Sequence, residues 1–218
     1  VGNTAPVDGD GVNTITFETN GDIYLNKTES GATNLAGKVE LGATVVGIVI
    51  TDSANPANAL SVSVDAISVD SEGNVSVEWL DLASLVDGSL TVSMSVVDSA
   101  GNEGNVTNSA ILDTTITAVL YFDDVTEDDI VNAIESQGTV TLTGIFAVED
   151  DTNAKDIVVT VNGHEYTVKA EDIQSDGGFS LDVTGSDLAS DSDHKLQVTA
   201  EFEDDAGNTI IIETGGGL

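Results

Sequence analysis

Clusters of carboxylates are the residues of this sequence best suited to chemistry. Many acids of the second half are adjacent to one another, as in Asp123-Asp124, Glu127-Asp128-Asp129, Glu149-Asp150-Asp151 and Glu203-Asp204-Asp205. Adjacent carboxylates repel one another, so a surface that is merely solvated would spread its acids along the chain. Calcium needs such clusters, because it takes about six to eight oxygen ligands. The clusters therefore favour binding of a hard divalent cation.

The net charge excludes several classes of partner. The chain has 39 acidic residues and five lysines, which gives a formal charge of −34. A nucleic acid or an anionic membrane surface would have to bind against this field, so we expect neither nucleic-acid binding nor membrane insertion. Acidic surfaces also keep proteins soluble, and halophilic proteins are acidic throughout. These two explanations of the charge stay open beside cation binding.

An enzymatic function has little support. The chain has no cysteine, which removes thiol nucleophiles, thiolate metal sites and disulfides. Its two histidines, His164 and His194, are predicted to be solvated loop residues, and a zinc site would require histidine clusters. Carboxylate pairs abound, but acid–base catalysis needs a cleft that separates their pKa values. We therefore expect no catalytic residues.

Length and composition indicate two globular domains. The 218 residues are 40% apolar, enough for two cores in domains of about 100 residues each. No apolar run reaches about 18 residues, and no signal segment opens the sequence. We expect any targeting signal to lie outside this sequence.

A short acidic turn recurs one domain later. VVDSAGN at 96–102 returns as FEDDAGN at 202–208, so that Asn208 lies 106 positions after Asn102. Two further pairs follow the same order: Asn26 and Glu29-Ser30 with Asn132 and Glu135-Ser136, and Leu35-Ala36-Gly37 with Leu142-Thr143-Gly144. Constant order and near-constant offset indicate a tandem repeat. The predicted modules are 1–112 and 113–218.

Each predicted module consists of short β-strands. Runs rich in Val, Ile and Thr alternate with turn residues, and Asn162-Gly163 between two such runs predicts a hairpin. Seven strands in about 100 residues are typical of an immunoglobulin-like sandwich. The expected fold is thus all-β, with two tandem immunoglobulin-like β-sandwiches joined by a short acidic linker. Segments 80–86 and 186–190 are expected to form one turn each, and the side chains expected in the cores include Trp79, Phe146, Tyr166 and Phe179.

Several strings resemble one known family. NAIESQGTVTLTG, VTVNGHEYTV, GGFSLDVTGSDLASD and LQVTAEFEDDAGNT in the second module, with VSMSVVDSAGNEG in the first, resemble the bacterial immunoglobulin-like repeats of giant calcium-dependent RTX-type adhesins. AILDTTI between the modules resembles their Asp-Thr-Thr linker. The resemblance covers essentially the whole chain. It implies modules that are stacked into an extender and stiffened by calcium, on the outside of a bacterial cell.

The position of the acids predicts where calcium binds. In an immunoglobulin-like sandwich, the turn between the last two strands and the turn between the second and third strands lie at the N-terminal end of the module. Linker, lower module and upper module would therefore offer oxygens at one junction. The predicted inter-module ligands are Asp22, Glu29, Asp113, Glu149, Asp150, Asp151, Asp204, Asp205 and Asn208. A second set is predicted at the N-terminal end of module 1: Asp8, Asp10, Glu40, Asp98 and Asn102.

A purely structural role of the recurring turn stays open. Asp-x-Ala-Gly-Asn is also a good hairpin turn, since Asp and Asn bond their own backbone and Gly accepts positive φ. Asp8-Gly9-Asp10-Gly11 does not begin an EF-hand loop, because Asn13 and Thr19 stand where that loop needs Gly and Glu. Glu40 alone corresponds to Glu149–Asp151, so we expect the two modules to differ in the number of bound ions.

The sequence favours a calcium-rigidified extender, or stalk, of a large bacterial cell-surface adhesin that projects ligand-binding domains away from the cell. Its partners would be neighbouring modules of the same chain, and the fragment would be a monomer. Two alternatives remain. One is an adhesin module that itself binds a sugar, ice or a host protein through its end loops, although few aromatic residues are available for a carbohydrate platform. The other is an accessory domain pair of a carbohydrate-active enzyme.

Overall fold

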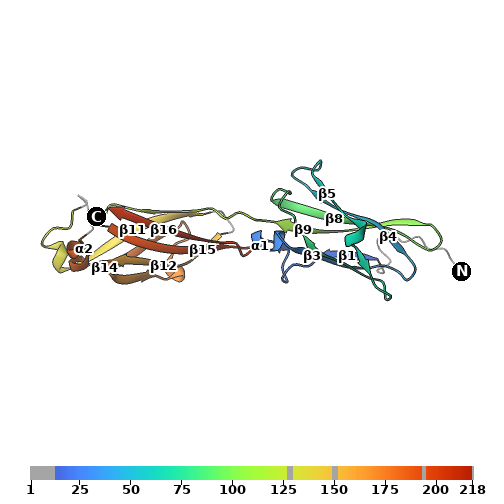
Figure 1. Ribbon diagram of the computed structural model, residues 1–218. Helices are drawn as coiled ribbons and strands as arrows, with labels where there is room; N and C mark the ends of the chain where they lie inside the picture. The colour runs from blue at the N-terminus through green and yellow to red at the C-terminus, as the bar shows by residue number, and fades with distance from the viewer. Residues whose placement is uncertain (1–12, 127–129, 149–151, 193–194, 218) are drawn as a thin grey trace. The chain divides into compact units, whose positions relative to one another are not determined.

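β-Strands form almost all of the regular structure. The computed structural model describes residues 13–126, 130–148, 152–192 and 195–217 (Figure 1). Contacts divide the chain into two compact units, Val1–Thr115 and Ile116–Leu218, called unit 1 and unit 2 below. The all-β prediction is confirmed. The module boundary between residues 112 and 113 stays a prediction.

Unit 1 contains two sheets (Figure 1). The first has the antiparallel order β1 (Thr14–Phe17), β3 (Thr33–Lys38), β7 (Asn74–Leu80), β6 (Ser68–Val69). The second has the order β2 (Tyr24–Leu25), β9 (Glu103–Leu112), β8 (Gly88–Val97), β4 (Thr44–Asp52), β5 (Ala59–Val62), with β2 parallel to β9. A four-residue helix, α1 (Lys27–Ser30), follows β2, and a 3-10 turn occupies Val64–Ala66.

Unit 2 repeats this plan. One sheet has the order β10 (Ala118–Phe122), β11 (Thr139–Val148), β14 (Gly178–Thr184). The other has the order β13 (His164–Val168), β12 (Thr152–Val161), β15 (Lys195–Asp204), β16 (Thr209–Gly217). Helix α2 (Gly185–Ser190) follows β14, and 3-10 turns occupy Glu135–Gln137 and Ala170–Asp172. The predicted hairpin is present, with Asn162 and Gly163 at φ of 50° and 80° between β12 and β13.

Alternating apolar side chains build a separate core in each unit. In β8, Leu90, Val92, Met94 and Val96 are all buried. In unit 2, Phe146 and Phe179 are buried as predicted, and Tyr166 is half-buried against the core. One face of each sheet therefore faces the core, as in a β-sandwich.

Two expectations fail in unit 1. Trp79 does not enter the core, since its side chain is 75% exposed. The reason is an irregularity between β3 and β7, where the register shifts between Thr33 and Leu35 and breaks the alternation of β7. The run LSVSVDAISV at 60–69, whose alternation of apolar residues predicts one strand, instead contributes to β5, a 3-10 turn and β6, and the two strands lie in different sheets.

Candidate functional site

The repeated turn is held together by its own first and last residues. In unit 1, Asp98 Oδ1 accepts hydrogen bonds from the backbone N–H groups of Ala100 and Asn102, both at 2.8 Å. Its other oxygen accepts from Asn102 Nδ2 at 2.6 Å. Hydrogen bonds from the Asn102 side chain and backbone lower the pKa of Asp98, because they favour the ionised form. The recurring motif is therefore a closed hairpin turn that displays a carboxylate.

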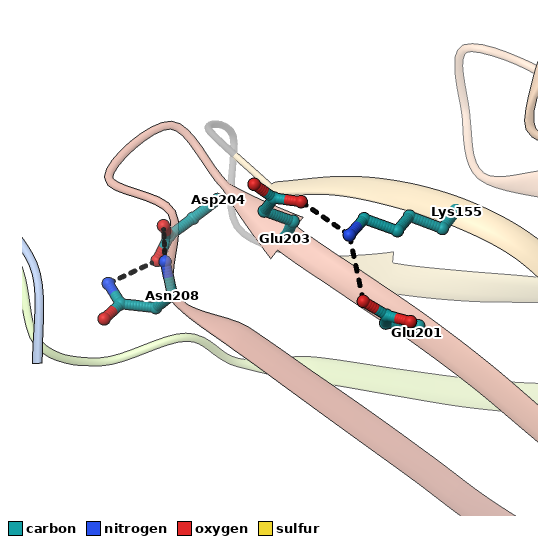
Figure 2. Close-up of polar contacts among 5 residues, drawn as sticks. All are labelled: Lys155, Glu201, Glu203, Asp204 and Asn208. Atoms are coloured by element: carbon teal, nitrogen blue, oxygen red, sulfur yellow. Dashed lines mark hydrogen bonds and ion pairs between the residues drawn. The ribbon is translucent and has the colours of Figure 1, made fainter. Parts of the chain in front are cut away.

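The same contacts recur in unit 2 in a buried setting. Asp204 accepts from the backbone N–H and from Nδ2 of Asn208, both at 2.8 Å (Figure 2). Asp204 is 6% exposed and Asn208 is 7% exposed. A third turn of this kind, missed by the sequence comparison, runs from Asp70 to Asn74, with Asn74 Nδ2 donating to Asp70 at 2.7 Å. Its signal was present in the sequence as Asp-x-x-Gly-Asn.

A lysine lies among the acids near the unit 2 turn. Lys155 Nζ lies 2.9 Å from Glu201 and 2.7 Å from Glu203 (Figure 2). Hydrogen bonds, first to Glu203 and then to Glu201, raise the pKa of this lysine. All three side chains are exposed to more than 40%, so each pair adds little stability. Lys155 neutralises part of the negative charge beside the Glu203-Asp204-Asp205 cluster.

Asp22 and Glu29 are engaged locally in unit 1. The Asn26 side chain accepts from the N–H groups of Thr28 and Glu29, while Glu29 accepts from the Asn26 N–H, which is a capping box. Asp22 accepts from the Tyr24 N–H at 2.8 Å. Asn132 and Glu135 repeat the reciprocal bonds in unit 2. This shared cap is the physical reason for the recurrence of Asn-x-x-Glu-Ser.

The segment Asp113-Thr114-Thr115 is tied to unit 1. The Asp113 N–H donates to the Leu25 carbonyl at 3.0 Å. Asp87 accepts from the N–H and hydroxyl of Thr114, at 3.0 and 2.9 Å, and from the Thr115 hydroxyl at 3.1 Å. Sequence reasoning missed Asp87, because it lies 27 positions before Thr114 and no short motif connects them.

At the predicted N-terminal end of module 1, the turns are adjacent. The Glu40 N–H donates to Asn13 Oδ1 at 3.0 Å, and a Cβ placed on Gly42 would lie 4.0 Å from Ser99 Cβ in the Asp98 turn. The β3–β4 connection therefore lies beside the β8–β9 turn, as expected. Asp205 is an exposed residue within the corresponding turn of unit 2.

Neither unit by itself holds a complete set of candidate ligands among the residues that the structure describes. Across those ranges, no group of three or more acidic or histidine side chains could hold a metal ion. Five candidates lie outside the described residues: Asp8, Asp10, Glu149, Asp150 and Asp151. The predicted ligand sets remain predictions.

A second polar cluster connects a hairpin to α2. Asp187 accepts from the Tyr166 hydroxyl and lies 2.8 Å from His164 Nδ1. The Tyr166 hydrogen bond, and next that of His164, lower the pKa of Asp187. His164 is exposed, as predicted, but it begins β13 and is paired with Asp187. His194 lies outside the described residues.

Comparison with solved structures identifies the relatives of this fold. A structure that concerns host cell surface retention of a 1.5-MDa bacterial ice-binding adhesin matches 99% of this chain, with 27% identity and a TM-score of 0.61. A Ca²⁺-stabilised adhesin that helps an Antarctic bacterium to reach out and bind ice matches 98% of the chain, with 24% identity and a TM-score of 0.60. This chain spans 65% and 49% of those two chains.

A third match is a bacterial immunoglobulin-like domain from the M. primoryensis ice-binding adhesin, 31% identical over 47% of this chain and 96% of that domain, with a TM-score of 0.41. No family model and no curated protein matches the sequence. The predicted resemblance to giant bacterial adhesins is confirmed, since this chain is similar to the 1.5-MDa bacterial ice-binding adhesin over almost its whole length. Within the described residues, no helix is long and apolar enough to cross a membrane.

Proposed function

We propose that this chain is a pair of extender modules from a giant bacterial adhesin, because it is similar to the 1.5-MDa bacterial ice-binding adhesin. The observation that carries the proposal is the match to the 1.5-MDa adhesin over 99% of the chain. In this function the two units act as spacers on the bacterial cell surface and carry no catalytic site. Their partners are neighbouring modules of the same chain, and the fragment is monomeric.

Calcium is the cation that the donor chemistry fits. The candidate ligands are oxygens of carboxylates and of two Asn side chains, which hard divalent cations prefer. Asp98 Oδ2 accepts one hydrogen bond, so it keeps a lone pair for a cation. An ordinary Asp carboxyl is ionised at neutral pH, and the lowered pKa of Asp98 keeps this carboxylate ionised under more acidic conditions as well. When bound, calcium would neutralise clustered charge.

The residues proposed to hold calcium are those of the two predicted sets. In the inter-module set, Asp204 and Asn208 close a preformed turn that contains the exposed Asp205, and Asp113 lies near the end of unit 1. Neutralisation of these acids would reduce the self-repulsion of a chain with a charge of −34. Stiffening of the linker by calcium is the proposed mechanical result.

A thermal melt in EDTA and in millimolar calcium tests the proposal, with magnesium at matched ionic strength as the control. A ligand that prefers the folded state raises the melting temperature, and we expect a calcium-specific rise of about 10 °C or more. A rise no larger than that caused by magnesium would contradict calcium binding and leave the acids as a solvated surface.

A matched pair of variants locates the ion. Asp205→Asn removes an exposed acid of the candidate set, whereas Asp65→Asn removes an exposed acid from the 3-10 turn of unit 1, outside both sets. Both variants change the net charge by one unit. We expect only Asp205→Asn to reduce the calcium-dependent rise. Equal effects of the two variants would indicate general charge screening.

A further inference from the structure

Trp79 is the residue of the described chain that a simple spacer does not explain. It is the only tryptophan in the sequence, and 75% of its side chain is exposed. Its backbone has a φ of 61°, in the left-handed region that a bulky residue rarely adopts. A large apolar side chain is therefore held on the surface by an unfavourable backbone conformation. Such an arrangement persists only where the surrounding structure imposes it.

A β-bulge imposes this conformation. Leu35 pairs with Val77, and the next pair is Thr33 with Leu80, so that Glu78 and Trp79 together lie opposite Asn34. Asn34 Oδ1 accepts the Trp79 N–H at 3.1 Å and replaces the missing ladder bond. A bulge bends the strand and changes the direction of a side chain. Without it, alternation from Val75 and Val77 would have placed Trp79 in the core.

Unit 2 shows that the sandwich does not need this bulge. There, Leu142 pairs with Leu181, Thr141 with Asp182, and Val140 with Val183, in one continuous register. These pairs correspond to Leu35 with Val77 and Thr33 with Leu80 in unit 1. Unit 2 thus has one residue where unit 1 has two. Trp79 is part of a one-residue insertion that only unit 1 carries.

We propose that Trp79 is the centre of a carbohydrate-binding site on the outer face of the β1-β3-β7-β6 sheet, which takes the pyranose rings of a neutral or amino-bearing polysaccharide. The exposed indole ring of Trp79 offers a flat apolar surface. A pyranose ring has a flat face of C–H groups that can stack on it. The bulge and the Asn34 hydrogen bond fix the backbone at the ring, which reduces the entropy lost on binding.

Polar neighbours match the hydroxyl groups of a sugar. The Asn34 side chain lies on the outer face opposite the bulge, and because its oxygen holds the Trp79 N–H, its NH₂ group can donate to a hydroxyl. Glu78 is exposed beside Trp79. Glu18, which follows β1, is also exposed, and its N–H donates to the Asn34 carbonyl at 3.0 Å. These carboxylates can accept from hydroxyls or pair with an amino group.

Charge and the character of this face exclude other occupants. With a net charge of −34, anionic polysaccharides, nucleic acids and anionic lipids would be repelled. A protein partner would need more apolar area, but the neighbouring outward residues are small or polar, such as Thr16, Ala36 and Ser76. A single exposed ring amid hydroxyls, amides and carboxylates is suited to a polyhydroxylated ligand.

Intrinsic fluorescence provides a direct test, because every tryptophan photon comes from Trp79. The whole fragment in calcium buffer would be titrated with cellohexaose as the neutral probe, a chitosan hexamer as the amino-bearing probe and an alginate hexamer as the anionic probe. We expect a saturable change in emission with one or both of the first two, at a dissociation constant on the order of 1 mM, and none with alginate. No saturable change with either cellohexaose or chitosan would overturn the proposal.

Variants distinguish a binding role from a structural one. By calorimetry, Trp79→Ser should weaken binding of the responding sugar about tenfold or more, whereas Trp79→Tyr should retain most of it. Deletion of Trp79 would give unit 1 the continuous register that unit 2 has. This variant should lose sugar binding, while circular dichroism shows an intact fold. Unchanged affinity in folded Trp79→Ser would contradict the site. Saturation by a lysine oligomer and by no sugar would replace the carbohydrate with a cationic peptide.

One further variant tests whether a carboxylate on this face pairs with the amino groups of the sugar. Glu18→Gln removes one carboxylate from this face without touching the ring or the bulge. It should weaken binding of the chitosan hexamer and leave binding of cellohexaose unchanged. An equal loss for both probes would contradict the pairing of Glu18 with an amino group.

Discussion

The three Asp-x-x-Gly-Asn turns show how burial changes the value of one set of contacts. Asp70, Asp98 and Asp204 each accept from the side chain and backbone of the Asn four positions later. The pair at Asp204 is buried, whereas the pair at Asp70 is exposed. An unsatisfied donor is costly only where water cannot replace the lost partner. Equal contacts should therefore contribute unequally to stability.

We expect Asp204→Ala to destabilise unit 2 by about 1–3 kcal/mol, because the buried N–H and Nδ2 of Asn208 lose their acceptor. Asp70→Ala removes the same contacts at an exposed turn and should cost clearly less. Urea unfolding in EDTA, followed by circular dichroism, measures both without any contribution from calcium. Equal losses in the two variants would show that burial does not decide the outcome.

The Asp52 carboxylate should make the stability of unit 1 depend on pH. It is buried, and its carboxylate accepts the N–H groups of Val86, Ala54 and Asn55. These hydrogen bonds, that of Val86 first, lower its pKa in the folded state. A carboxyl with a lowered folded pKa contributes stability that is complete above its unfolded pKa of about 3.9 and is lost as pH falls below that value.

The corresponding experiment compares wild type with Asp52→Asn between pH 7 and pH 2.5. Protonation of other acids relieves the repulsion of a highly charged chain, so the difference between the two proteins carries the information. Asp52→Asn should be the less stable protein at pH 7. The difference between the two proteins in free energy of unfolding should decrease below about pH 4. A gap that stays constant with pH would mean that Asp52 has the same pKa in both states.

At the scale of strands, two glycines explain the repeated Leu-x-Gly motif. A Cβ on Gly37 would lie 2.3 Å from the Thr14 carbonyl oxygen, and one on Gly144 would lie 2.3 Å from that of Tyr121. In both units the neighbouring edge strand passes too close for any side chain. We expect Gly37→Ala and Gly144→Ala to destabilise their units by about 1–3 kcal/mol.

Gly138→Ala is the matched control, since its Cβ would meet only an ordinary contact at 3.9 Å. The melting temperature of each variant, measured with the same buffer and fragment, gives the ranking. A loss for Gly138→Ala as large as that for Gly144→Ala would show that helix and strand propensity, rather than close approach, sets the cost.

The sequence predicted the strands in which apolar residues alternate regularly. It did not predict the structure where one extra residue interrupts the alternation. Apolar residues alternate regularly in the sequences of β8 and β14, and Asn162-Gly163 predicted its hairpin, because both signals are local. The bulge at Trp79 depends on its pairing with Asn34 across strands, which no local pattern records. Of the candidate site, the turn from Asp98 to Asn102 was predictable as a motif, whereas the partner of the linker was not.

At the scale of the whole chain, the end of unit 1 that leads into unit 2 is the feature on which an extender depends. Asp87 accepts three hydrogen bonds from Thr114 and Thr115, and its neighbour Val86 is held by buried Asp52. None of these hydrogen bonds involves a predicted calcium ligand. The start of the linker should therefore be ordered on unit 1 even without calcium, and calcium would act on what remains free.

Asp87→Ala should release the linker while the unit stays folded. In EDTA, hydrogen exchange followed by NMR should show the Thr114 amide exchanging about tenfold faster or more, because its acceptor is gone. The Asp113 amide, which donates to Leu25, is an internal reference and should keep its protection. Asp81→Ala is the matched control, since Asp81 accepts from the N–H group of Ala83, two positions later in unit 1. Unchanged protection of Thr114 in Asp87→Ala would show that the anchor does not order the linker, and calcium would then have to supply all of its stiffness.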